Sequence, residues 1–129
     1  MSDFIAYAGR VFQIEWYYTA GGKSQALDYA NNMSKQEVAR LIHLLERMGD
    51  HGRIHDKRKF RNEGDKIYAF KPQPHRFLCF FVEGKKIIIT NAFWKKQDKL
   101  PKGEKERALN CMADYQKRVQ EDTYYEQEN

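Results

Sequence analysis

The chain has 129 residues, a length that predicts a single domain (1–129) with one hydrophobic core. Its 41% hydrophobic and 32% charged residues are typical of a globular protein and argue against global disorder. The formal net charge is +5, yet the last nine residues hold four acidic side chains and no Lys or Arg. The sequence thus predicts a basic core over about 10–120 and an acidic tail over 121–129. A basic body of this kind either binds nucleic acid or simply keeps the protein in solution.

The usual signatures of metal, redox and membrane proteins are missing from the sequence. Cys79 and Cys111 fall in an apolar strand and a helix, where we expect small buried hydrophobic residues. Since there is no metal-ligand cluster, carboxylate pair or glycine-rich phosphate loop, we predict neither a metal nor a cofactor. Without a signal peptide or an apolar run of the ~20 residues that span a bilayer, we expect a cytoplasmic protein with no membrane contact.

The first half of the chain predicts one strand and two helices. Residues 1–9 have little pattern and are expected to fray, whereas 10–18 alternate, with one uniformly apolar face: Phe12, Ile14, Trp16 and Tyr18. Ser24 can cap a short helix through about Asn31. Ser34 and Glu37 form a capping box that opens a second helix, which Gly49 would end. The apolar stripe of that helix is Val38, Leu41, Ile42, Leu45 and Met48.

The second half predicts a three-stranded meander and a final helix. Residues 66–71, 76–83 and 86–93 are rich in aromatic and β-branched residues, and they are broken by two prolines and by Gly84. A loop over 100–103 and a helix over 104–120 follow, with Ala108, Met112, Tyr115 and Val119 on one face. The fold predicted is α+β, in the order β-α-α-β-β-β-α, with a small mainly antiparallel sheet and the helices on one face.

Cationic residues gather before the meander and along its rims. The predicted RNA-binding residues are Arg53, Lys57, Arg58, Lys59, Arg61, Lys66 and Lys99. The segment 53–61 can be read as a solvated loop, but its position beside the meander favours a contact with RNA phosphates.

Four runs carry a resemblance to a known family. They are 12–18 (FQIEWYY), 67–71 (IYAFK), 75–80 (HRFLCF) and 87–96 (IIITNAFWKK). In order and spacing they resemble the RelE/HigB superfamily of toxin–antitoxin toxins, most closely its phage-derived HigB-like branch, over roughly residues 10–118. The resemblance implies a ribosome-dependent, metal-free mRNA endonuclease that blocks translation. It also implies a cognate helix-turn-helix antitoxin, the ribosome and mRNA as partners, and an oligomer formed with the antitoxin or with itself.

The resemblance also implies which residues are catalytic. Arg76 matches the strand arginine that contacts the scissile phosphate, Lys71 stands at a cationic position, and Lys95 and Lys96 match the basic pair after the last strand. We take these four as the predicted catalytic residues.

Two positions differ from the family. Asn91 stands where the branch usually has histidine, and Ala69 where it often has an acid. Because an amide cannot transfer a proton at neutral pH, cleavage would need another group.

Metal-free RNA cleavage needs three things: a base for the 2′-OH, positive charge at the phosphate, and an acid for the departing 5′-oxygen. Arg76, expected to face solvent, offers a bidentate fork for the phosphate. Lys71, with its pKa depressed among cations, is the first choice for proton transfer, and His75 or His55 the second. His75 lies on the other strand face, which favours a structural role.

Two further interpretations stay open at this point. Phe93 and Trp94 can either stack a base or pack in the core. The whole protein can also be a non-catalytic nucleic-acid-binding accessory protein of phage origin, or a ParE-like gyrase inhibitor on the same fold.

Overall fold

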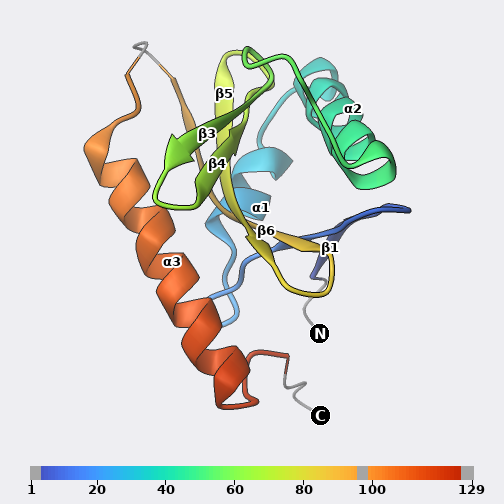
Figure 1. The fold of residues 1–129 in the computed structure, drawn as a ribbon. Coiled ribbons are helices and arrows are strands. Elements are labelled where there is room, and N and C mark those ends of the chain that lie inside the picture. The colour runs from blue at the N-terminus through green and yellow to red at the C-terminus, as the bar shows by residue number, and fades with distance from the viewer. Residues whose placement is uncertain (1–3, 96–98, 126–129) are drawn as a thin grey trace.

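The computed structural model describes residues 4–95 and 99–125 and contains a mixed sheet with three helices (Figure 1). In chain order the elements are β1 (Ile5–Ala8), β2 (Gln13–Trp16), α1 (Gln25–Asn31), α2 (Lys35–His51), β3 (Phe60–Gly64), β4 (Ile67–Phe70), β5 (His75–Val82), β6 (Lys86–Trp94) and α3 (Lys102–Gln120). The α+β class and the three-stranded meander are confirmed. Among the described residues, no helix combines the length and apolar composition needed to cross a bilayer.

The six strands lie in the order β1-β2-β6-β5-β4-β3. Strand β2 runs parallel to β6, with Ile14 opposite Ile87 and Trp16 opposite Ile89. The other neighbouring pairs are antiparallel. The meander β4-β5-β6 therefore supplies the centre of the sheet, and the N-terminal hairpin extends it on one side.

The helices cover both faces of the sheet, which corrects the prediction that they share one face. Figure 1 shows α3 on one side of the sheet and α2 on the other. One core contains Phe77 and Cys79 of β5 together with residues of α1 and α2, and the other contains Leu78 and Phe80 with Tyr115 of α3. The physical reason is that β5 is apolar at consecutive positions, so both of its faces must be covered.

Helices α1 and α2 begin where their capping residues predicted. The Ser24 hydroxyl accepts a hydrogen bond from the N–H of Leu27, and Ser34 and Glu37 complete the capping box. Helix α2 does not end at Gly49 but continues to His51, and Gly52 caps it with φ +76°. Gly49 serves packing instead: a Cβ there would collide with the ring of Tyr7.

Two strands and one terminal segment were not predicted. Residues 5–8, expected to fray, pair with β2, and residues 60–64 form edge strand β3 beside β4. After α3, Tyr124 turns back into the second core and is only 4% exposed. Residues 121–125 of the acidic tail are therefore part of the fold, because burial of the rings of Tyr124 and Tyr125 outweighs the polar character of the three residues before them. Helix α3 also begins earlier than expected, at Lys102.

Glu37 ties the start of α2 to β5. Besides accepting from the N–H of Ser34 at 2.9 Å, its carboxylate lies 2.7 Å from His75 Nε2. The Ser34 N–H and, next, His75 hold the pKa of Glu37 at about 2, below its usual 4.5. A lowered folded-state pKa contributes stability above the unfolded value, and this stability is lost as the pH falls toward 2.

We therefore expect Glu37→Gln to lower the melting temperature at pH 6, with the difference from wild type shrinking between pH 4.5 and 2. Glutamine keeps the capping hydrogen bond but loses the charge that faces His75. Thermal unfolding followed by circular dichroism across this pH range measures the effect. A difference that stays constant with pH would contradict the charge-based explanation.

Candidate functional site

The turn over residues 72–74, between β4 and β5, is where the predicted catalytic residues meet. Lys71 precedes this turn and Arg76 follows it by two residues. The backbone N–H of Lys95 donates to the carbonyl of Pro74 at 3.0 Å, and the Gln73 side chain accepts from Arg76 at 3.2 Å. The fold thus brings together three of the four predicted catalytic residues. Lys96 lies outside the described residues.

Arg76 is buried, with only 6% of its surface exposed, which corrects the expectation that it faces solvent. The reason is that its neighbours on the same face of β5, Leu78 and Phe80, belong to the second core. One guanidinium nitrogen donates to the backbone carbonyl of His75 at 2.9 Å. Burial lowers the pKa of Arg76, but a guanidinium remains charged at neutral pH. A fixed, poorly hydrated positive charge of this kind favours an anionic partner.

Lys71 is also buried, with 8% of its surface exposed. Its Nζ donates to the backbone carbonyl of Lys57 at 3.0 Å. Burial lowers the pKa of Lys71, and the charges of Arg76 and Lys95 lower it further. A lysine with a lowered pKa holds a larger neutral fraction near pH 7 than an exposed lysine does, so Lys71 is suited to proton transfer.

Glu63 is a carboxylate beside this cluster that the sequence analysis missed. Its negative charge raises the pKa values of both Lys71 and Arg76, which places it within electrostatic range of both. Glu63 belongs to edge strand β3, where Arg61 lies opposite Ala69. Ala69 cannot supply the acid that the resemblance led us to expect at its position, whereas Glu63 offers a carboxylate on the neighbouring strand. Its only signal in the sequence is a place in a short polar stretch beside the meander.

The side chain of Asn91 has a structural role. It is fully buried, and its amide nitrogen donates to the backbone carbonyl of Glu104 at 3.2 Å and to the Glu104 carboxylate at 3.1 Å. Its amide oxygen accepts from the Thr90 hydroxyl at 2.6 Å. These contacts join β6 to the first turn of α3. The position where the resemblance led us to expect a histidine is therefore covered by α3 rather than open to a substrate.

The predicted RNA-binding residues are all exposed but do not form one patch. Lys57, Arg58 and Lys59 approach the cluster, since their backbone carbonyls accept hydrogen bonds from Lys71 or Gln73. Lys66 lies at the far end of the β3–β4 hairpin. Arg53 directly follows Gly52, at the end of α2. These last two are not brought to the cluster.

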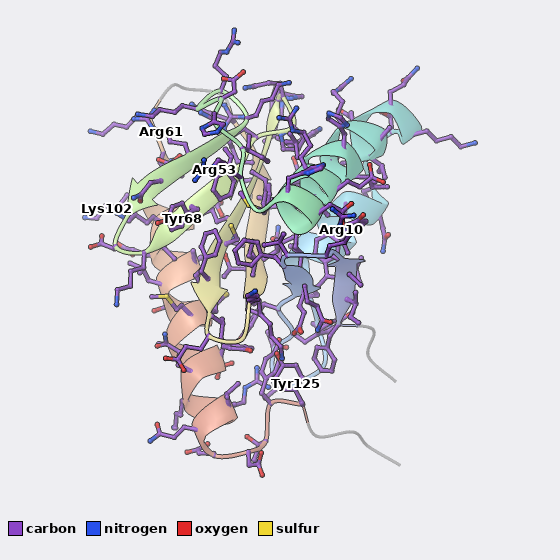
Figure 2. The ribbon with its side chains drawn as sticks, turned by 45° about the vertical axis from the view of Figure 1, so that its right-hand side comes forward. Arg10, Arg53, Arg61, Tyr68, Lys102 and Tyr125 are labelled. Carbon is purple, nitrogen blue, oxygen red and sulfur yellow. The ribbon has the colours of Figure 1, made fainter. Side chains whose placement is uncertain are left out.

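Arg61 and Lys99 line a cavity of about 470 Å³ between β3 and the start of α3. Lys102 and Lys105 add positive charge, although Lys105 is paired with Asp65 at 2.8 Å. Glu63, Asp65 and Glu106 are the carboxylates of the lining. Figure 2 shows Arg61 and Lys102 along the same side of the molecule. Through Glu63, this cavity places the exposed Arg61 and Lys102 near the buried cluster.

Of the two histidine candidates and the two aromatic candidates, one of each pair is buried and the other is exposed. His75 is buried, and its Nδ1 lies 2.6 Å from the Tyr29 hydroxyl while its Nε2 faces Glu37, which confirms the structural role. His55 is exposed in the loop before β3. Phe93 is part of the second core, whereas Trp94 is 54% exposed. Trp94 is thus the one of the pair that a base can reach.

Across residues 4–95 and 99–125, no three His, Cys, Asp or Glu side chains lie together as a metal site requires. Cys79 is completely buried and Cys111 partly so. The described side chains of this site offer fixed cations, a nearby carboxylate and a lysine with a lowered pKa.

Comparison with models of known protein families places the chain in one of them. The family model for phage-derived Gp49-like proteins (DUF891) matches residues 28–113, more than half of the chain. The matched region runs from α1 to α3 and includes the turn over residues 72–74 with its cations. A search of the curated proteins gave no match. The chain therefore belongs to the Gp49-like family of phage-derived proteins, within the RelE/HigB-like toxin superfamily.

Proposed function

We propose that the protein is the toxin of a toxin–antitoxin pair from the HigB-like branch, and that it cleaves mRNA on the ribosome without a metal. The observation that carries the proposal is the buried pair Lys71 and Arg76 at the turn over residues 72–74, with Lys95 beside them. Buried cations are costly unless a fixed anion compensates them, and they cluster at functional sites. A helix-turn-helix antitoxin and a cytoplasmic location belong to the same proposal.

In this proposal the scissile phosphate sits against Arg76. The guanidinium would stabilise the negative charge that grows on the phosphate as the 2′-OH attacks, which is often the largest contribution to catalysis. Glu63 or neutral Lys71 would take the 2′-OH proton, and protonated Lys71 or Lys95 would protonate the 5′-oxygen. With the base and the acid assigned to these residues, cleavage does not require a histidine at position 91.

The direct test is a cell-free translation reaction with purified protein, in which mRNA ends are read by primer extension. We expect cuts only when ribosomes are present. An exposed arginine on α2, changed as Arg47→Ala, serves as a control that keeps full activity. Intact message at high protein concentration would reject the endonuclease and leave a binding function.

Lys71→Arg separates charge from proton transfer. Arginine keeps the positive charge but does not release a proton near neutral pH. If neutral Lys71 is the base, wild-type cleavage should rise with pH until it levels off below the ordinary lysine value, because the pKa of Lys71 is lowered. Lys71→Arg should lose about 10²–10⁴-fold in rate together with this pH dependence. An unchanged pH–rate profile in the variant would assign proton transfer to Glu63 or Lys95 instead.

The buried Asn91 favours a second candidate function. With this position closed by Glu104, the protein can bind RNA through its cations without cutting it. This candidate predicts salt-dependent RNA binding and no ribosome-dependent cuts.

A further inference from the structure

A second cavity lies between α2 and the turn over residues 72–74, on the side of the turn away from α3. Its volume is about 620 Å³, within the roughly 300–1,000 Å³ typical of small-molecule sites. Ala39 and Leu44 of α2, together with Pro72, provide its apolar lining. Its polar lining residues are Arg40, His43, Asp56, Arg58, Lys59, Lys71 and Gln73. The cavity therefore combines an apolar surface with a cationic rim.

The positive charge of this rim is only partly compensated by the described residues of the cavity. Asp56 is the only carboxylate among the described residues that line it. Both carboxylate oxygens of Asp56 already accept hydrogen bonds from Arg58, at 3.0 Å each. The described lining residues therefore include no further carboxylate that could pair with Arg40, Lys59 or Lys71. A ligand that fits must bring its own negative charge.

Lys71 connects this cavity to the proposed catalytic cluster. It lines the cavity, and it also lies within electrostatic range of Arg76 and Lys95. Its ammonium group has three donors, and one of them is used by the carbonyl of Lys57 at 3.0 Å. An anionic chain that reaches Arg76 can therefore continue past Lys71 into the cavity.

We propose that this cavity binds one nucleotide unit, with the base against Ala39, Leu44 and Pro72 and the phosphate at Arg40, Lys59 and Lys71. The inference rests on the proposed RNA-directed function and adds to it a binding site next to the catalytic cluster, with Lys71 belonging to both. The nucleotide can belong to an RNA strand or be free in solution. Charge complementarity accounts for the phosphate, and the apolar lining accounts for the flat base.

Binding is measured by fluorescence anisotropy of a labelled trinucleotide whose 2′-deoxy sugars prevent cleavage. We expect the double variant Arg40→Ala/Lys59→Ala to bind at least about tenfold more weakly, because two phosphate contacts are lost. Ala39→Phe fills the cavity without changing its charge and should weaken binding to a similar extent. Arg47→Ala removes an exposed arginine of the same helix outside the cavity and should bind like wild type. Melting curves establish that each variant is folded.

Competition identifies the source of the nucleotide. Displacement by adenosine 5′-monophosphate supports a site that accepts free nucleotides, and failure of displacement alongside weak binding in Ala39→Phe supports a site for an RNA strand. Inorganic phosphate that competes as well as the nucleotide, with Ala39→Phe unaffected, would overturn the inference in favour of an anion-binding surface. Equal affinity in all variants, or no binding to wild type, would also overturn it.

Ribosome-dependent cleavage by the same variants is recorded separately. If wild type cleaves mRNA but Ala39→Phe does not weaken binding, nucleotide binding in the cavity is rejected and the endonuclease proposal stands. If Ala39→Phe weakens binding but wild type does not cleave mRNA, nucleotide binding in the cavity stands and the endonuclease proposal is rejected.

Discussion

Arg76→Ala should lower the rate of ribosome-dependent mRNA cleavage by about 10²–10³-fold, the usual effect of removing one group that stabilises charge in the transition state. The side chain is almost fully buried and held by Gln73 and the His75 carbonyl, so its position is fixed before any substrate arrives. Primer extension on a defined message under single-turnover conditions measures the rate. Expression of the variant in a growing culture should also relieve any arrest of translation caused by wild type.

Arg76→Lys is the matched control for this prediction. Lysine keeps the charge but loses the planar fork, so we expect an activity between those of wild type and Arg76→Ala. Because Arg76 borders the second core, the melting temperature of each variant must be measured too. Full cleavage by a folded Arg76→Ala would remove this residue from the site.

Tyr124→Ala should destabilise the fold by about 3–5 kcal/mol, as expected for loss of a large buried aromatic ring. The ring lies 4.5 Å from Tyr115 and 4.8 Å from Tyr125, and the Arg118 guanidinium lies 4.7 Å from its centre. Its hydroxyl accepts from the backbone N–H of Tyr18 at 3.0 Å. Urea unfolding at constant pH measures the free energy, which should fall without a large change in slope.

Tyr124→Phe is the control that separates the ring from its hydroxyl. It removes the hydrogen bond from Tyr18 and should cost about 0.5–1.5 kcal/mol. A chain ended after residue 120 should be at least as unstable as Tyr124→Ala, because it also lacks Tyr125, whose hydroxyl donates to Glu15 at 2.7 Å. Figure 2 shows Tyr125 next to the end of α3. Wild-type stability in the shortened chain would contradict a structural role for this segment.

Local signals in the sequence predicted much of the fold. Ser34 and Glu37 were recognised because a capping box needs only four residues. The meander was recognised because β-branched and aromatic residues are bounded by proline and glycine. The grouping of Lys71, Arg76 and Lys95 was also accessible, because all three flank elements of that meander.

Features that depend on distant partners were missed. Strand β3 is polar at Arg61, Asn62 and Glu63, so only its pairing with β4 makes it a strand. Phe77 and Leu78 lie next to each other and are both buried, a pattern that indicates a sheet covered on two faces. Reading that pattern would have placed a helix on each side. The burial of Arg76 and the covering of Asn91 by α3 both follow from that arrangement.

The parallel pairing of β2 with β6 has a consequence for how the chain is made. Residues 13–16 leave the ribosome long before residues 86–89, the partners that complete their ladder. Contacts between residues so far apart in sequence raise the entropic cost of folding and slow it. Until β6 emerges, the hairpin β1–β2 has an unpaired edge and the buried turn with Lys71 and Arg76 is not assembled. The nascent chain should therefore acquire its cationic site only late in synthesis, after most of the protein has left the exit tunnel.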